Sequence, residues 1–424
     1  MPPRPAPSGP RSGLPLYLAT AFFARLADEG MAVAVALLAL ERSGSAAQGA
    51  FVLTAWMAPH VVAAPLVGAF ATRMRRPRLC HLAALGGFAT AIVTLSALVG
   101  RAPAPVVLAV ALTGGACGPA VSGGLSGLIA ALLPSGERRD RAYALDAAVY
   151  NAASVAGPAA VSVVTALASP GAAMTLLGGA AAVGAVLVTG LPYGAADQVT
   201  PGPLPARGTL RTDLTAGLTA LWRIRELRAI TAGTCLAFGG VGGLTTTAVL
   251  LAGHRGHPGA GGALMTAFAV GALLGALAVA RWQPPVPDQR LVVLALCGTG
   301  LALGAAALVP SPAAGAVLFV LAGVCDGPLL TATLRIRAAY APPRARAQVF
   351  TLGAGLKITA AACGAPLVGT AAALPPPLLL LAIAAVQLCA ALLYVLSRPR
   401  TGHRGGTPDT TKGTGTRPIP SPSR

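Results

Sequence analysis

Arginines in this chain gather in every second gap between its apolar runs. The clustered arginines follow the second, fourth, sixth, eighth and tenth runs, and they are Arg73, Arg75, Arg76 and Arg78, then Arg138, Arg139 and Arg141, then Arg207, Arg211, Arg223, Arg225 and Arg228, then Arg281 and Arg290, and finally Arg335, Arg337, Arg344 and Arg346. The intervening gaps hold only Arg42, Arg101 and Arg255. Because short loops rich in Arg and Lys stay in the cytoplasm, this alternation predicts an even number of membrane crossings with both termini inside. Twelve crossings fit the pattern.

The composition of the chain excludes a water-soluble globule. Of its 424 residues 55% are apolar and 10% are charged, and the mean hydropathy is +0.72. That balance is typical of a polytopic membrane protein. The net charge of +19 lies in short loops and tails between the runs, where anionic lipid headgroups explain it better than a nucleic-acid partner does.

The sequence carries no motif for chemistry on a bound cofactor. It has no phosphate loop of the Gly-x-x-x-x-Gly-Lys-Ser/Thr type and no nucleophile elbow. Its seven cysteines lie within or at the ends of apolar runs, without a CxxC pair or a His at metal spacing. We therefore expect no enzyme, no cofactor and no metal site.

Apolar runs of about 20 residues, the length that a helix needs to cross a bilayer, divide the chain into two halves. The expected helices are 15–40, 50–72, 79–100, 104–133, 143–169 and 172–193 in the first half, and 228–252, 260–281, 290–309, 312–335, 347–372 and 376–396 in the second. The predicted organisation is a cytoplasmic tail at 1–14, a bundle at 15–193, a linker at 194–227, a second bundle at 228–396 and a disordered cytoplasmic tail at 397–424. In the linker, Leu214, Leu218, Leu221 and Trp222 recur at helical spacing, which predicts an amphipathic helix on the membrane surface.

The two halves repeat a pattern of prolines. Pro119, Pro134 and Pro158 are separated by 15 and 24 residues, and Pro328, Pro343 and Pro366 are separated by 15 and 23 residues. Parallel six-helix repeats with basic loops at matching places are typical of transporters built from two rocking halves. The predicted fold is an all-α membrane protein with 12 transmembrane helices in two pseudo-symmetric six-helix bundles.

A few ionisable residues lie deep in the predicted spans, where each is costly unless it is paired or hydrated. On the first span Arg25 precedes Asp28 and Glu29 by three and four residues, so one or both acids can reach it. In a functional interpretation, one acid carries a proton or contacts a cationic substrate while Arg25 tunes its proton affinity. The alternative is a permanently paired triad that only orders the bundle.

Asp326 and Lys357 lie at matching depths on the tenth and eleventh spans. They are nine or ten residues from the predicted cytoplasmic ends of their helices, which places them roughly 15 Å deep on antiparallel neighbours. We predict an ion pair between them. The alternative is that Lys357 meets the acids of the first span across a central cavity.

Two further polar residues fall inside spans. His60 follows Pro59 on the second span, where it either titrates near neutral pH or stays neutral and hydrogen-bonded to a neighbouring helix. Asp146 opens the fifth span near the cytoplasmic face. We expect it to pair with Arg73 or Arg76 in a gate, with substrate binding as the alternative.

The segment after the second span carries a glycine and arginines at fixed spacing, and it reads Gly68-Ala-Phe-Ala-Thr72-Arg73-Met74-Arg75-Arg76-Pro77. With the twelve runs, the repeat and the linker, it makes residues 15–396 resemble the major facilitator superfamily, whose loop signature is Gly-x-x-x-Asp-Arg/Lys-x-Gly-Arg-Arg/Lys. Gly68, Arg73 and Arg76 match that signature, but Thr72 stands where the family has an acid. In the family that acid helps to latch the cytoplasmic side. The resemblance therefore implies a cytoplasmic gate whose usual latch is incomplete.

A second resemblance lies on the fifth span. Exporters of the superfamily carry Gly-x-x-x-Gly-Pro-x-x-Gly-Gly there, and this chain keeps the central Gly157-Pro158 while Ala153, Val161 and Ser162 replace the other glycines. The resemblance implies a bent helix and favours export.

These observations predict a secondary active transporter in the plasma membrane that exports a small amphipathic compound, such as a drug or natural product, in exchange for protons. Its partners would be the small-molecule substrate, protons and membrane lipid, and we expect a monomer with both termini cytoplasmic. Two alternatives are a proton-coupled importer of a small polar metabolite and a transporter-like membrane sensor that moves nothing.

Overall fold

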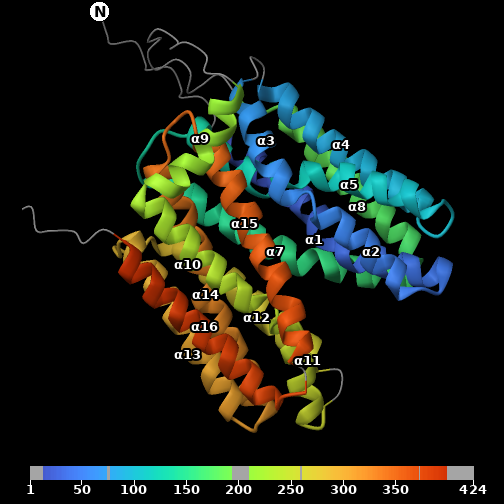
Figure 1. Ribbon diagram of the computed structural model, residues 1–424, viewed down its shortest axis with the longest axis vertical. Helices are drawn as coiled ribbons and strands as arrows, with labels where there is room; N and C mark the ends of the chain where they lie inside the picture. Colours follow the sequence, from blue (N-terminus) through green and yellow to red (C-terminus); the bar gives the residue numbers. More distant parts are fainter. Residues whose placement is uncertain (1–12, 74–76, 193–209, 258–259, 372, 399–424) are drawn as a thin grey trace, which may run out of the picture.

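The computed structural model describes residues 13–73, 77–192, 210–257, 260–371 and 373–398, and it arranges them in two bundles of helices (Figure 1). The first bundle comprises α1 (Leu14–Ser43), α2 (Ala46–Met57), α3 (His60–Arg73), α4 (Pro77–Leu98), α5 (Ala104–Pro119), the π-helix η1 (Ala120–Gly124), α6 (Leu125–Leu132), α7 (Glu137–Leu167) and α8 (Pro170–Thr189). The second comprises α10 (Arg225–Val241), α11 (Leu244–His254), α12 (Gly261–Trp282), α13 (Asp288–Leu308), α14 (Pro312–Tyr340), α15 (Arg346–Thr370) and α16 (Pro376–Ser397). The linker helix is α9 (Leu210–Arg223).

Each bundle contributes six spans, because some crossings are made of more than one helix. Eleven helical stretches of the described residues are long and apolar enough to cross a membrane. The twelfth span is α1, which is 30 residues long but carries Arg25, Asp28 and Glu29 among its apolar side chains. The predicted fold of twelve helices in two bundles is confirmed. Most of the two predicted tails, the last residue of the predicted first bundle (193) and the first part of the linker (194–209) lie outside the described residues.

Proline and glycine divide three spans that the apolar pattern predicts as continuous. Pro59 separates α2 from α3, and Pro119 ends α5 before the five residues of η1. Each proline lacks the N–H that a helix would use at that point. Between α10 and α11 the break falls at Gly242 and Gly243, where a Cβ on Gly242 would clash with the carbonyl oxygen of Ala361 on α15. The divisions thus follow from local backbone chemistry and close helix approach.

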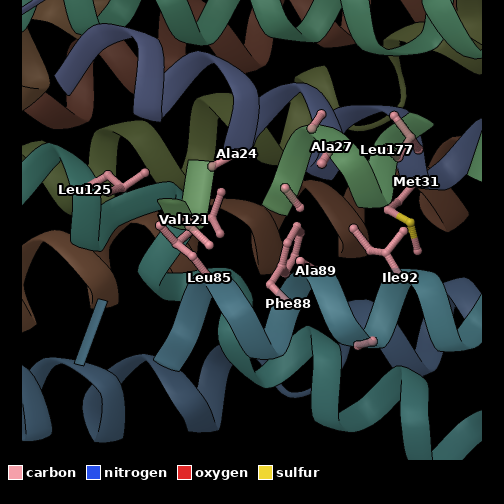
Figure 2. Close-up of a cluster of buried hydrophobic side chains, with 14 of the residues drawn as sticks. Ala24, Ala27, Met31, Leu85, Phe88, Ala89, Ile92, Val121, Leu125 and Leu177 are labelled. Carbon is pink, nitrogen blue, oxygen red and sulfur yellow. The ribbon is translucent and has the colours of Figure 1, made fainter. Parts of the chain in front are cut away.

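A buried apolar cluster holds α1, α4 and α8 together in the first bundle (Figure 2). Phe88 and Ile92 on α4 are fully buried, and so are Met31 on α1 and Leu177 on α8. The ring of Phe88 lies 5.0 Å, centroid to centroid, from that of Trp56 on α2. Alanines on α1 let the larger side chains of its neighbours approach closely, in the manner of small residues between membrane helices.

The two bundles meet at the end of the molecule where α9 lies, which we call the linker end, and diverge toward the end where α2 and α11 lie, which we call the far end (Figure 1). At the linker end α15 of the second bundle packs against α3, η1 and α6 of the first. The hydroxyl of Thr351 donates to the carbonyl of Ala64 at 2.8 Å, and the rings of Tyr143 and Phe350 stack with their centroids 6.0 Å apart. Halfway along, α7 packs against α12. The structure is therefore closed at the linker end.

Glycine packing between helices generates a first prediction. A Cβ on Gly323 of α14 would clash with the carbonyl oxygen of Phe268 on α12, whereas a Cβ on Gly179 of α8 would have no atom within 4 Å. We expect Gly323→Ala to force α12 and α14 apart and to lower the free energy of unfolding by about 1–3 kcal/mol. Gly179→Ala should be neutral or slightly stabilising, because alanine favours a helix. Thermal unfolding in detergent checks both variants, and equal melting temperatures would contradict this account of the packing.

Candidate functional site

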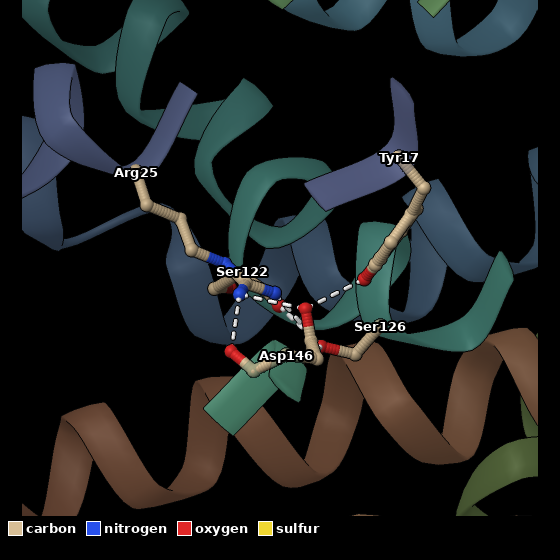
Figure 3. Close-up of polar contacts among 5 residues, drawn as sticks. All are labelled: Tyr17, Arg25, Ser122, Ser126 and Asp146. Carbon is tan, nitrogen blue, oxygen red and sulfur yellow. Dashed lines mark hydrogen bonds and ion pairs between the residues drawn. The ribbon is translucent and has the colours of Figure 1, made fainter. Parts of the chain in front are cut away.

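A buried ion pair joins α1 to α7 in the first bundle (Figure 3). Nη1 of Arg25 donates to Oδ1 of Asp146 at 2.8 Å and to its backbone carbonyl at 3.0 Å, and both side chains are 1% exposed. Nη2 of Arg25 donates to the hydroxyl of Ser126 at 2.9 Å. That hydroxyl donates to Oδ2 of Asp146 at 2.6 Å, and the hydroxyl of Tyr17 donates to Oδ1 at 2.7 Å. Both carboxylate oxygens of Asp146 are thus satisfied within one bundle.

Of the two alternatives for Arg25, Asp28 and Glu29, the permanently paired triad is wrong. The guanidinium of Arg25 reaches Asp146, and neither Asp28 nor Glu29 lies within the 4.0 Å of an ion pair with it. The physical reason is the direction of helical side chains, which lean toward the N-terminus of the helix. Arg25 therefore extends toward the linker end, whereas Asp28 and Glu29 are attached nearly one turn further toward the far end.

The expected pairing of Asp146 with Arg73 or Arg76 is also wrong, because Arg25 is its partner. Asp146 is 1% exposed, and it faces the interior of the first bundle rather than the gate. Arg73 is the last residue of α3 but its side chain lies outside the described part, and so does the whole of Arg76. Their expected role in the gate stays a prediction.

Asp28 and Glu29 are half-buried on α1. Asp28 faces the indole of Trp56 without completing a hydrogen bond to it. Glu29 faces the hydroxyl of Tyr150 on α7 and is within electrostatic range of Lys357 on α15. The two acids of α1 therefore have different neighbours, and of the two only Glu29 has a charged neighbour on the second bundle.

Lys357 lies between two carboxylates without pairing with either. Among the described residues no carboxylate oxygen lies within 4.0 Å of its ammonium, so the predicted ion pair with Asp326 is not formed. The ammonium lies over two rings instead, 4.2 Å from the centroid of Phe238 on α10 and 5.2 Å from that of Tyr150. Both Asp326 and Glu29 are within its electrostatic range. Favourable contacts with aromatic faces explain why the ammonium turns from Asp326.

We call Asp28, Glu29, Asp326 and Lys357 the central charged group. Its members come from both bundles, and the lysine is 8% exposed while the three acids are half-buried. Among the described residues, none of the three carboxylates forms an ion pair of 4.0 Å or less. Charges held in the interior without a fixed partner are free to exchange partners, protons or a charged ligand.

Arg337 on α14 belongs beside this group, and sequence reasoning missed it. Its side chain is 3% exposed, and its Nε and Nη2 atoms have no hydrogen-bond partner among the described residues. It packs against Gly353 of α15 and is within electrostatic range of Lys357. The predicted span ends at residue 335, so Arg337 is assigned to the loop, but α14 continues to Tyr340. A longer predicted helix would have placed it inside the span.

His60 is not brought into the central charged group. It is 4% exposed, its Nδ1 lies 3.1 Å from the carbonyl oxygen of Met57, and its ring packs so closely on Gly118 that a Cβ there would clash with Nε2. Both interpretations of His60, as a group that titrates near neutral pH and as a neutral hydrogen-bonded residue, stay predictions.

Two glycines of the expected motifs mark close helix contacts. A Cβ on Gly68 would lie 2.6 Å from the Cα of Gln348, so this glycine allows α3 of the first bundle to touch α15 of the second. A Cβ on Gly157 would lie 2.8 Å from the backbone nitrogen of Gly30, so α7 packs closely on α1 at that point. Pro158 follows inside α7, which continues to Leu167. Among the described residues no cluster of His, Cys, Asp or Glu could hold a metal ion.

Comparisons with known proteins agree with this architecture. A sequence model described as the Major Facilitator Superfamily matches residues 17–284. An uncharacterized MFS-type transporter, y4rN of Sinorhizobium fredii (strain NBRC 101917 / NGR234), is 25% identical over 364 residues, which cover 84% of this chain and 88% of that protein.

Two solved structures share the fold. The human organic anion transporter MFSD10 (TETRAN) superposes with a TM-score of 0.69 at 19% identity, over 91% of this chain and 98% of that one. The Escherichia coli fucose:proton symporter FucP superposes with a TM-score of 0.68 at 11% identity, over 92% of this chain and 100% of that one.

The buried pair generates a second prediction. Removing one partner of a buried ion pair leaves the other charge uncompensated, so Asp146→Ala should lower the free energy of unfolding by about 3–5 kcal/mol. Tyr17→Phe removes one hydrogen bond and should cost about 1 kcal/mol. Thermal or chemical unfolding of the purified variants checks this order.

The matched control is Asp288→Ala, because Asp288 pairs with Arg335 at 3.4 Å and is 27% exposed. Removing that partly exposed pair should cost less than about 1 kcal/mol. If Asp146→Ala and Asp288→Ala were equally stable, the buried pair would not have the structural role assigned to it.

Proposed function

This chain belongs to the major facilitator superfamily, and from that premise we propose that it is a secondary active transporter that exports a small amphipathic compound in exchange for protons. The family and fold are those of membrane transporters rather than enzymes. The direction of transport, the coupling ion and the class of substrate are what we propose beyond the family. We further propose that it works as a monomer in the plasma membrane, with the tails and the linker in the cytoplasm, because the arginine-rich gaps follow the positive-inside rule.

The observation that carries the proposal is the central charged group. A charged side chain costs several kcal/mol inside a bilayer, and such charges are found mainly where ions, protons or substrates move. The pair between Arg25 and Asp146 offsets that cost with an ion pair and several hydrogen bonds within one bundle. Glu29 and Lys357 form no ion pair with each other. They belong to different bundles but lie within electrostatic range of each other. Such an arrangement suits a group that changes its charge during a cycle.

In the proposed cycle, Glu29 carries the proton and Lys357 responds to it. With the linker end in the cytoplasm, the structure is closed to the cytoplasm, and in the proposed cycle the acids take up their proton from the outside. A proton that enters from the outside neutralises Glu29 and removes one of the two charges that attract Lys357. The ammonium is then held by Asp326 of its own bundle, and the attraction between the bundles at this level is weakened. Release of the proton to the cytoplasm restores it.

The side chains around the central charged group support an amphipathic substrate. Trp56, Phe238 and Tyr150 bring aromatic faces to a region that also holds three acids and an amine. A compound with an apolar body and a charged or protonatable group fits such neighbours. The low aromatic content of the chain as a whole, 4%, argues against a sugar site, which needs several stacking rings and many amides. Export is favoured by the resemblance at Gly157 and Pro158.

Flux measurements test the proposal. A susceptibility screen of cells with and without the protein identifies a transported compound, and proteoliposomes with an imposed pH gradient then measure its movement together with that of protons. We expect the compound to move against the direction of proton flow. Glu29→Gln should abolish proton-coupled flux, and Asp28→Asn should reduce it, because both remove an acid near the centre. Asp288→Asn is the control, because its partly exposed pair lies outside the central charged group.

Three results would contradict the proposal. Flux and proton coupling that survive both Asp28→Asn and Glu29→Gln would exclude these acids as proton carriers. Movement of compound and protons in the same direction would indicate the proton-coupled importer. A protein that moves none of the compounds whose toxicity it alters would indicate the membrane sensor.

A further inference from the structure

The linker helix α9 fastens the two bundles together at the linker end. Gly217 lies on its buried face, and the backbone N–H of this glycine donates to Oε1 of Gln348 on α15 at 2.5 Å. A Cβ on Gly217 would clash with the side chain of Gln348, and a Cβ on Gly68 of α3 would lie 2.6 Å from the same residue. Gln348 is 1% exposed and is therefore enclosed between α3 of the first bundle and α9.

This arrangement makes the docking of α9 depend on the closed linker end. The helix contacts both α3 and α15, which belong to different bundles. If the bundles separated at the linker end, α9 could keep only one of these contacts. Its docked position therefore stabilises the closed state. A ligand that binds the docked helix more tightly than the undocked helix favours the closed state by that difference in binding free energy.

The exposed face of α9 carries two large apolar side chains next to two threonines, Thr215 and Thr219. Trp222 is 71% exposed and Leu218, one turn earlier, is 56% exposed. At 100° per residue Trp222 points about 140° away from Gly217, so this pair faces away from the bundles. The membrane-spanning stretch that contains α10 begins at Arg225, only three residues after Trp222. Its position just before that candidate span suits the headgroup region, where tryptophan is enriched in membrane proteins.

Basic side chains flank the exposed tryptophan. Arg223 and Arg225 are exposed, and Arg228 donates to the backbone carbonyl of Trp222 at 3.3 Å. Glu226 is the acid among them. A helix with an exposed apolar face and neighbouring arginines at the membrane boundary has the charge and shape that suit a surface of anionic headgroups.

We propose that Leu218, Trp222, Arg223 and Arg225 form a docking surface for anionic lipid, and that lipid bound there holds α9 on the closed linker end. The apolar pair enters the headgroup region while the two arginines contact lipid phosphates. Through Gly217 and Gln348, the lipid composition of the adjoining leaflet then sets how readily the bundles separate at this end. The inference concerns α9 and the membrane, and it does not depend on which compound or ion the protein moves.

Hydrogen exchange of the full-length protein in nanodiscs tests the proposal. Exchange across residues 215–223 is measured in phosphatidylcholine alone and in phosphatidylcholine with phosphatidylglycerol. We expect the anionic lipid to slow exchange by roughly fivefold for each arginine that it contacts, because a basic residue near an anionic surface gains about that factor in its equilibrium. Added salt should reduce the effect, because it screens the headgroup charge.

Variants separate the docking surface from a general effect of charge. The double variant Arg223→Gln with Arg225→Gln should lose the lipid-dependent protection, whereas Arg281→Gln with Arg344→Gln should keep it. These two exposed arginines lie away from α9, in the last turn of α12 and in the turn before α15. Gln348→Ala should speed the exchange of α9 in both lipids. Equal exchange in the two lipids, or protection that survives in the first double variant, would overturn the proposal. Because no transport is measured, these outcomes are independent of the proposed transport function.

Discussion

Burying charge in an apolar bundle is the constraint on which the rest of this structure depends. A guanidinium or a carboxylate in such an interior must be neutralised by a partner, hydrated or used. Arg25 and Asp146 meet the constraint by pairing with each other, and Ser126 and Tyr17 add hydrogen bonds to a pair that is almost unexposed. This pair fixes α1 against α7, and that attachment also places the acids of α1.

The same constraint separates the structural charges from those of the central charged group. Glu29 and Lys357 lie on opposite bundles, and the aromatic faces of Tyr150 and Phe238 hold the ammonium without neutralising it. Tyr150 also lies 5.2 Å from the guanidinium carbon of Arg25, so one ring connects the fixed pair to the unpaired lysine. A bundle that needed only stability could replace such charges by apolar side chains at little loss. We interpret their presence as a consequence of transport.

Much of the fold could be predicted from the sequence, because hydropathy, arginine positions and the spacing of prolines each report on the membrane directly. The central side-chain pairings could not. Depth placed Asp326 and Lys357 at the same level, but depth says nothing about the rings of Phe238 and Tyr150, which come from other helices. The pairing of Arg25 with Asp146 joins residues 121 positions apart, which local spacing cannot show. Arg337 was missed because the end of α14 lies five residues beyond the predicted helix.

The central claim is that two rigid bundles rock about a charged centre. The most direct test is to measure the distance between the bundles at each end of the molecule. Spin labels at the exposed positions Arg101 and His257 report on the far end, and labels at Arg138 and Arg344 report on the linker end. The account predicts that a change of pH shortens one distance while it lengthens the other, since protons act on the centre between them. Two distances that change in the same direction, or that do not respond to pH at all, would contradict it.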